Sequence, residues 1–182
     1  MGKNNLQRAN TQVREQKEFE EEVLEIGRVT RVVKGGRRLR FRCTVAIGDL
    51  KGRVGIGTGK AAEVVTGIKK AVTKAKKNLI KVPITKGESI PHLVNIKYKA
   101  ARLLLMPASP GTGVIAGGTL RKILYLSGIK NVLCKDFGSR NPLVTAQASI
   151  KALKALRHVR RDERHQPANT SSKAEAPKQE KK

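Results

Sequence analysis

Apolar residues at every second position from 39 to 47, with arginine between the first of them, predict that this part of the chain forms a β-strand. Arginine occupies three even positions in succession, namely Arg38, Arg40 and Arg42. Apolar side chains occupy the odd positions, namely Leu39, Phe41, Cys43, Val45 and Ile47. Because successive side chains of a strand point to opposite faces, we expect one face in a core and the other to carry a stripe of arginines.

Glycine occupies every second position of the segment that follows a predicted turn at residues 48–49. The glycines Gly55, Gly57 and Gly59 alternate with Val54, Ile56 and Thr58. One face of this third strand would therefore carry no side chains. A bare face permits close approach of another backbone, so either the next helix or a nucleic-acid backbone should lie against it.

A tight hairpin with a basic tip is predicted before the arginine stripe. Residues 23–33 are rich in β-branched side chains, which favour strands. The pair Gly35 and Gly36 allows the positive φ of a short hairpin turn. Lys34 and Arg37 flank these glycines, so the tip should present positive charge.

The apolar period changes to that of a helix after the glycine-rich strand. The expected helix covers residues 61–79, with an apolar stripe of Ala61, Val64, Val65, Ile68, Val72, Ala75 and Leu79. Lysines fall on another face, namely Lys70, Lys74, Lys77 and Lys81. Like charges at this spacing destabilise a helix unless an anion neutralises them. A solvated lysine face is the plain alternative, and the arginine stripe in the same unit favours the anion.

A second unit follows a predicted linker at residues 83–91, which contains two prolines. Strands are expected near 92–97, 101–106 and 131–135, an irregular loop at 107–113, and helices at 118–127 and from 142 onward. Asn141 should cap the last helix and Pro142 should be its first residue. The expected apolar stripe of this helix is Leu143, Ala146, Ile150, Leu153 and Leu156.

These segments give two folded units, at residues 19–82 and 92–161. Both ends of the chain are polar and lack large apolar residues over long stretches. We therefore expect a disordered N-terminal extension at 1–18 and a disordered basic tail at 162–182.

The charge balance makes a polyanion the first expected partner. The 182 residues contain 39 Lys plus Arg against 14 Asp plus Glu, a formal net charge of +25. Aromatic residues are only 3% and Trp is absent, so charge and shape should dominate recognition over base stacking. The residues favour RNA, while nonspecific DNA packaging stays open. No apolar run approaches the roughly 20 residues of a membrane span, so no membrane partner is expected.

An enzyme is poorly supported by the sequence. The stretch Gly55–Lys60 departs from the phosphate-loop spacing at Val54 and Ala61. The pattern Gly111-x-Gly113-x-x-Ala116 suggests a dinucleotide site, but too few residues follow it for that fold. We therefore expect no catalytic residue, no metal site, no cofactor and no small-molecule substrate. Cys43 and Cys134 should be small buried apolar residues.

Three segments carry a family resemblance. They are RVTRVVKGGRRLRFRCTVAIGDLKGRVGIGTGKAAEV at 28–64, LMPASPGTGVIAGGTLRKIL at 105–124 and KDFGSRNPL at 135–143. In this order they resemble the small-subunit ribosomal protein five family of bacteria and organelles. The resemblance implies an α+β fold. Its N-terminal part would be a double-stranded-RNA-binding-like domain, and its C-terminal part a small α/β domain with a left-handed βαβ crossover.

The resemblance also implies a function. The chain would be a structural constituent of the small ribosomal subunit that binds 16S-type rRNA and contacts small-subunit proteins four and eight. It would lie where mRNA enters the subunit and support translational accuracy, in a cytoplasmic or, alternatively, an organellar ribosome. The tip at 34–37 matches a family loop whose alteration affects the spectinomycin response and subunit assembly. Gly111 and Arg121 match the region that faces protein four.

Two sets of candidate residues follow. The expected RNA-binding residues are Arg28, Arg31, Lys34, Gly35, Gly36, Arg37, Arg38, Arg40, Arg42, Arg53, Lys60, Lys70, Lys74 and Lys77. The expected protein-interface residues are Gly111, Gly113 and Arg121. The rivals are an enzyme that uses the Gly111 loop and a free-standing, nonspecific nucleic-acid binder.

Overall fold

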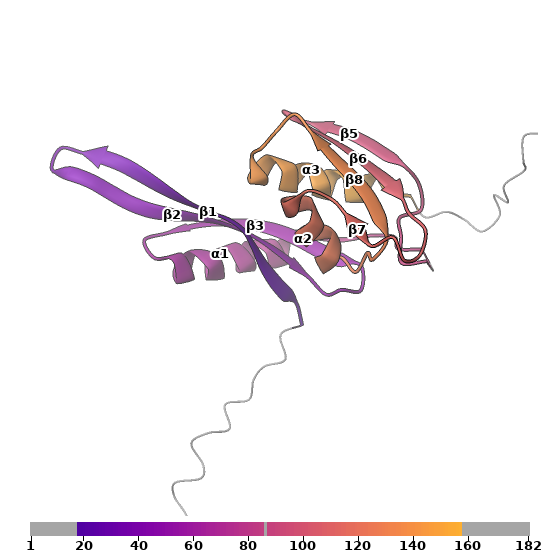
Figure 1. Ribbon diagram of the computed structural model, residues 1–182. Helices are drawn as coiled ribbons and strands as arrows, with labels where there is room; N and C mark the ends of the chain where they lie inside the picture. Colours follow the sequence, from indigo (N-terminus) through magenta and orange to yellow (C-terminus); the bar gives the residue numbers. More distant parts are fainter. Residues whose placement is uncertain (1–17, 86, 158–182) are drawn as a thin grey trace, which may run out of the picture.

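The computed structural model describes residues 18–157 except residue 86. The predicted N-terminal extension at 1–18, apart from Glu18, and the predicted basic tail at 162–182 lie outside the described residues. The first sheet has the order β1-β2-β3-β4, and all of its pairs are antiparallel. The first unit consists of β1 (Glu20–Val33), β2 (Gly36–Gly48), β3 (Arg53–Ala61), α1 (Val64–Lys77) and β4 (Leu79–Lys81). Strands β1 and β2 form a long hairpin that extends well beyond the rest of the molecule (Figure 1).

The hairpin tip is as short as its sequence predicts. Val33 pairs with Gly36, so only Lys34 and Gly35 form the loop. Gly36 has a φ of 144°, a value that side-chain-bearing residues rarely adopt. The second glycine of the pair is therefore the one that this turn requires.

Helix α1 covers the glycine face of β3, which the sequence had left open to either a helix or a nucleic-acid backbone. A Cβ on Gly55 would lie 2.7 Å from the carbonyl oxygen of Ala75, and one on Gly57 would lie 2.6 Å from the amide nitrogen of Ala75. These distances leave no room for a side chain. The bare face therefore seats a helix rather than a nucleic-acid backbone.

The predicted limits and apolar stripe of this helix were partly wrong. The helix begins at Val64, because Ala61 still pairs with Phe41 as the last residue of β3. Val65 is 64% exposed, whereas Gly67 and Ala71 are buried. Three of the four buried residues of α1 are small, namely Gly67, Ala71 and Ala75, because the backbones of α1 and β3 lie so close together; Val72 is the fourth.

The two faces of β2 change character along the strand. Cys43, Val45 and Ile47 are buried, as predicted, but Leu39 is 46% exposed because the hairpin there has left the core. Thr44 and Ala46, on the arginine side, are also fully buried. The second unit covers that side, since a Cβ on Gly48 would collide with the backbone of α2. The face of β2 that carries the arginines is therefore exposed only in the outer half of the strand.

The second unit is a four-stranded sheet with two helices. Its elements are β5 (Val94–Tyr98), β6 (Ala101–Pro107), β7 (Val114–Ile115), α2 (Gly118–Leu126), β8 (Val132–Phe137) and α3 (Pro142–Ala155). The strand order is β5-β6-β8-β7, and only β7 and β8 pair in parallel. The short β7 was missed by the sequence analysis, and it begins a β7-α2-β8 crossover. The predicted α+β class with two units is confirmed.

The start of α3 confirms the predicted cap. The side chain of Asn141 accepts a hydrogen bond of 3.0 Å from the amide of Leu143, and Pro142 follows the cap. The predicted stripe holds at Ala146, Leu153 and Leu156, but Leu143 and Ile150 are only partly buried. Small side chains fill the contact instead, namely Thr145, Ala148, Ser149 and Ala152.

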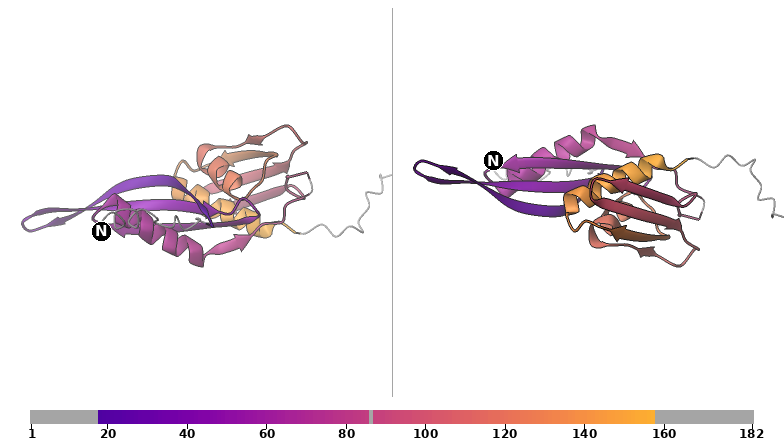
Figure 2. Two further views of the ribbon diagram at one scale, coloured as in Figure 1. Left: turned by 90° about the horizontal axis from the view of Figure 1, so that it is seen from below. Right: turned by 90° about the horizontal axis from the view of Figure 1, so that it is seen from above.

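The segment between the two units is packed into the main core. Val82 and Ile90 are 3% and 2% exposed, and both contact the cluster that contains Leu103 and Leu124. The amide of Val82 donates to the carbonyl of Gly52 at 2.7 Å. The second unit thus lies against the face of the first sheet opposite α1, and the hairpin projects from the side (Figures 1 and 2).

Asp49 organises the turn between β2 and β3. Its Oδ1 accepts from the amides of Lys51 and Arg53 at 2.8 Å, and its Oδ2 accepts from Nε of Arg53 at 2.6 Å. The carboxylate is 6% exposed. Burial alone raises the pKa of Asp49, but the hydrogen bonds and the charge of Arg53 outweigh it and lower the pKa below 3.8.

Replacement of Asp49 by alanine should destabilise the fold mainly above pH 4. A folded-state pKa below the unfolded value stabilises the protein above the unfolded pKa, and this contribution is lost as pH falls through the folded pKa. We expect a loss of about 2 kcal/mol in the free energy of unfolding at pH 7. Denaturant titrations of both proteins at pH 7 and pH 3 should show the difference shrink in acid, and a constant difference would contradict this role.

Candidate nucleic-acid interface

One side of the hairpin gathers the basic residues that the alternation predicted. Residues paired across an antiparallel sheet share a face, and Arg31 pairs with Arg38 while Val29 pairs with Arg40. These side chains and Lys60 line a groove of about 170 Å³. We call it the hairpin groove; its lining residues are Val29, Thr30, Arg31, Arg38, Arg40 and Lys60.

A second basic groove lies between β3 and α1. It has a volume of about 440 Å³ and shares Lys60 with the hairpin groove. We call it the edge groove; its lining residues are Thr58, Gly59, Lys60, Thr66, Lys69, Lys70, Thr73, Lys74 and Lys77. Strand β4 pairs with β3 only from Arg53 to Gly55, so the groove follows the part of β3 that β4 leaves open.

The two grooves combine cations with hydroxyl groups. Eight basic side chains line them, and no acidic side chain is among their lining residues. Lysine and arginine donate hydrogen bonds to phosphate oxygens, and threonine hydroxyls can donate hydrogen bonds to sugar hydroxyls or accept them. No aromatic side chain lines either groove. The arrangement is therefore suited to a sugar-phosphate backbone rather than to base stacking.

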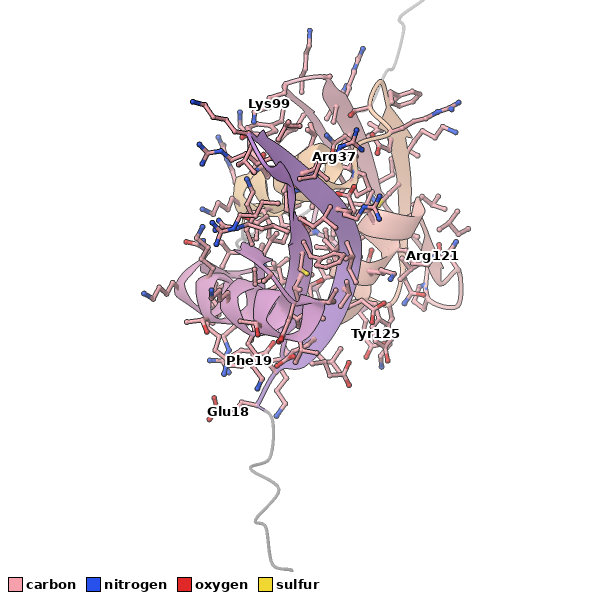
Figure 3. The ribbon with its side chains drawn as sticks, turned by 90° about the vertical axis from the view of Figure 1, so that its left-hand side faces the viewer. Glu18, Phe19, Arg37, Lys99, Arg121 and Tyr125 are labelled. Atoms are coloured by element: carbon pink, nitrogen blue, oxygen red, sulfur yellow. The ribbon has the colours of Figure 1, made fainter. Side chains whose placement is uncertain are left out.

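The remaining predicted RNA-binding residues lie elsewhere. Arg28 pairs with Phe41 and Arg37 pairs with Val32, which places both arginines on the opposite side of the hairpin. Lys34, Gly35 and Gly36 form the tip (Figure 3 looks along the hairpin, with Arg37 labelled).

Two predicted arginines already contact carboxylates. Arg42 lies 3.9 Å from Glu25 at the base of the hairpin, outside the hairpin groove. Arg53 forms the 2.6 Å ion pair with Asp49 and lies 5.3 Å from the ring centroid of Phe19. Arg53 therefore contributes to the turn and to the N-terminal end of β1 and lines neither groove.

The predicted protein-interface residues fall in two separate places. Arg121 lies on α2 beside Tyr125, and both line a cleft of about 300 Å³ that also contains Glu20, Glu21 and Glu22 (Figure 3). Gly111 and Gly113 belong to the loop before β7 and do not line this cleft. The structure thus does not bring the glycines and Arg121 into one site.

The Gly111 loop lacks the free amides of a dinucleotide site. The amides of Gly111 and Gly113 both donate to Oδ1 of Asn131, at 3.1 and 3.2 Å. Their φ angles of 92° and 76° explain why glycine is needed at both positions. Because the amides are already occupied, this loop cannot hold a pyrophosphate as a Rossmann turn does.

The other glycine pattern is equally unsuited to phosphate binding. Gly55, Gly57 and Gly59 lie in the extended strand β3, and their bare face is filled by the backbone of α1. A phosphate loop needs a turn that leads into the N-terminus of a helix. The enzyme rival therefore has no support at either glycine pattern.

The two cysteines differ in burial: Cys43 is buried, as predicted, whereas Cys134 is only partly buried. Burial raises the pKa of the Cys43 thiol, and it raises the pKa of the Cys134 thiol to about 12. No group of three potential metal ligands occurs within residues 18–157, leaving aside 86. The described helices also include none long and apolar enough to cross a membrane.

Sequence reasoning missed several residues of the grooves. Lys69 and Thr73 line the edge groove, and Val29 and Thr30 line the hairpin groove. Lys69 and Thr73 are four residues apart on α1, so helical spacing could have placed them beside Lys70 and Lys77. The side of β1 that faces Arg38 depends on the strand register, which only the structure fixes.

Comparison with known proteins identifies the family. Residues 19–83 match the N-terminal domain of ribosomal protein S5, and residues 96–166 match its C-terminal domain. The small ribosomal subunit protein uS5c of Rhodomonas salina is 48% identical over 153 residues, which cover 84% of this chain and 91% of that protein. The protein uS5 of Thermosynechococcus vestitus is 51% identical over 145 residues, which cover 80% and 83%. The chain therefore belongs to the ribosomal protein S5 family, a family of small-subunit ribosomal proteins and not of enzymes, as its motifs predicted.

Proposed function

We propose that the chain binds 16S-type rRNA in the small subunit through the hairpin groove and the edge groove. The observation that carries this proposal is the continuity of the two grooves at Lys60, with eight cations and no acid among their lining residues. Such a surface neutralises phosphates and fixes the position of the protein on the RNA without reading its sequence. The role is structural, since the protein holds RNA segments in place.

Recognition would depend on the shape of the RNA backbone. A-form RNA displays phosphates and 2′-hydroxyls across its wide minor groove, and dsRNA-binding domains contact these groups. The two grooves offer cations and threonine hydroxyls in that combination. We accordingly assign residues 19–82 to a double-stranded-RNA-binding-like domain, 83–91 to a linker and 92–161 to the C-terminal α/β domain.

The protein-facing surface is proposed to lie on α2. The cleft beside Arg121 and Tyr125 carries three glutamates, of which Glu22 pairs with Lys122 at 2.6 Å. Acidic side chains repel phosphates, so this surface suits a neighbouring basic protein better than rRNA. We place small-subunit protein four there and protein eight against the C-terminal domain, in a cytoplasmic or organellar ribosome. The position where mRNA enters the subunit and the effect on accuracy are part of the same proposal.

Competition binding separates this function from nonspecific nucleic-acid binding. The full-length chain is bound to a labelled small-subunit rRNA transcript and challenged with unlabelled transcript, random RNA duplex or random DNA duplex. Raising the salt removes the nonspecific electrostatic contribution. We expect the rRNA to remain the stronger competitor at 0.3 M salt, by about 100-fold or more. Equal competition by random duplexes would overturn the proposal.

The isolated protein should be destabilised by its own charge. The net charge of +25 is only weakly screened at low ionic strength, so like-charge repulsion opposes the compact state. We expect the melting temperature of the RNA-free protein to rise between about 0.02 and 0.3 M salt, across which the Debye length shortens several-fold. A melting temperature that stays constant or falls would contradict the repulsion.

A further inference from the structure

A third and larger groove lies where the two units meet. Its volume is about 630 Å³, within the range of about 300–1,000 Å³ that is typical of ligand sites. Helix α1 contributes Lys74 and Lys77, and helix α3 contributes Lys151 and Lys154. We call it the interdomain groove. The C-terminal domain thus supplies two of the four lysines that line this groove.

Among the described residues, the charges of this groove have no acidic partner. Its lining residues include the four lysines and no acid. All four lysines are exposed, and none of them forms an ion pair with a described residue. Lysines brought from two domains to the walls of one groove repel each other unless a polyanion lies between them. The domain packing therefore creates a site that an anion stabilises.

The interdomain groove continues the surface already described. Thr58, Lys74 and Lys77 line both the interdomain groove and the edge groove, and the edge groove in turn shares Lys60 with the hairpin groove. A single basic path thus leads from the hairpin, along the open part of β3, to α3. A single phosphate would occupy only one of the grooves, whereas a polynucleotide can occupy all three.

The open edge of β3 adds donors of a second kind. Strand β4 ends its pairing opposite Gly55, so the outer backbone groups of β3 from Ile56 onward have no partner strand in the described residues. Lysines on both sides disfavour the addition of a strand from another protein. Backbone amides at such an edge are free to bind phosphate oxygens. Tyr98 at the wall of the groove offers a ring for a base, although Lys99 and Lys151 already lie 5.4 and 5.5 Å from its centroid.

We propose that one strand of the rRNA leaves the edge groove and crosses the interdomain groove, where Lys151 and Lys154 of α3 bind its phosphates. The inference rests on the proposed rRNA-binding function and extends it to the C-terminal domain. Both domains would then contact the same RNA strand. RNA binding would hold the two domains together as well as neutralise their repulsion.

Paired neutralisations test the assignment. The variant Lys151→Gln/Lys154→Gln is compared with Lys97→Gln/Lys135→Gln, which removes the same charge from exposed strand positions outside all three grooves. Binding of each full-length protein to the small-subunit rRNA transcript is measured by fluorescence anisotropy over a salt series. Loss of two phosphate contacts to a single strand should lower the affinity roughly 20-fold at 0.1 M salt and reduce the slope of log K against log salt by about 1.4.

A third variant separates failure of this inference from failure of the proposed function. Arg38→Gln/Arg40→Gln should weaken binding whichever surface α3 contacts. If the α3 variant binds like the Lys97/Lys135 control while the hairpin variant is weakened, the inference is overturned and the proposed function stands. If the hairpin variant also binds like the control, the proposed function is overturned.

The melting temperature of the RNA-free variant provides a second test, because it should rise while the affinity for RNA falls. If the lysines face one another without a counter-charge, Lys151→Gln/Lys154→Gln should raise the melting temperature of the free protein at low salt while it weakens RNA binding. A purely structural role for these lysines predicts a lower melting temperature, and that result would contradict the inference.

Discussion

Reversal of the three hairpin arginines should nearly abolish binding to small-subunit rRNA. In the variant Arg31→Glu/Arg38→Glu/Arg40→Glu, all the replaced side chains line the hairpin groove. Three lost phosphate contacts correspond to an affinity loss of about 100-fold at 0.15 M salt, and the introduced carboxylates add repulsion. Filter binding of the full-length variant to the rRNA transcript measures the effect.

A control with the same change in net charge separates a local contact from a general electrostatic effect. Lys97→Glu/Arg102→Glu/Lys135→Glu reverses three exposed charges on β5, β6 and β8, none of which lines a basic groove. We expect this control to lose less than about 10-fold, through the long-range field alone. Equal losses in the two variants would contradict the assignment of the hairpin groove. Melting curves should show both variants folded, because these positions contribute little to the core.

Replacement of Gly57 by valine should prevent the first domain from folding. A Cβ at this position would collide with the carbonyl of Ala71 and lie 2.6 Å from the amide nitrogen of Ala75, and both groups belong to the backbone of α1. The helix would have to move off the sheet and expose Val45, Ile47 and Val72. We expect a loss of at least about 4 kcal/mol in the free energy of unfolding, as is typical of severe overpacking.

Gly35→Ala is the matched control for this prediction. It adds a side chain to the hairpin turn of the same domain, but nothing lies within 4 Å of the added Cβ and the φ of Gly35 is not positive. Its effect should stay within about 0.5 kcal/mol. Circular dichroism and urea titration of both variants measure the difference. A folded Gly57→Val protein with stability near that of Gly35→Ala would show that α1 does not lie against β3 as described.

The parts of the fold that depend on local pattern could be predicted from the sequence. The apolar residues at every second position from Leu39 to Ile47 identified β2, and Asn141 with Pro142 identified the start of α3. These signals follow from the period of a strand and from the unpaired amides at a helix start. They involve only neighbours in the chain.

The parts that depend on packing between distant segments could not be predicted. The glycines of β3 predicted that another backbone lies close to this strand. Only the position of α1 shows that this backbone is a helix and not a nucleic acid. Likewise, the burial of Thr44 and Ala46 on the arginine side results from the second domain. Residues 83–91 were predicted to be a linker because of their prolines, but Ile90 of this segment and the neighbouring Val82 belong to the shared core.

The candidate interface shows the same division. The arginines of β2 and the lysines of α1 were visible as periodic basic residues, whereas their connection through Lys60 required the register between β2 and β3. The spacing of Lys151 and Lys154 places them on one face of a helix. Their position opposite Lys74 and Lys77 depends on how the domains pack. Arg53 was predicted to bind RNA because of its charge, but in the structure it forms an ion pair with Asp49.

The most direct test of rRNA binding in the small subunit is sedimentation of a cell lysate that contains the tagged full-length chain. The lysate is layered on a sucrose gradient at moderate salt with magnesium. We expect the wild-type chain to comigrate with small subunits in amounts equal to a resident small-subunit protein. The variant Arg31→Glu/Arg38→Glu/Arg40→Glu should remain near the top of the same gradient. A wild-type chain that stays at the top, or a variant that comigrates as fully as the wild type, would contradict the claim that the basic grooves bind this protein to small-subunit rRNA.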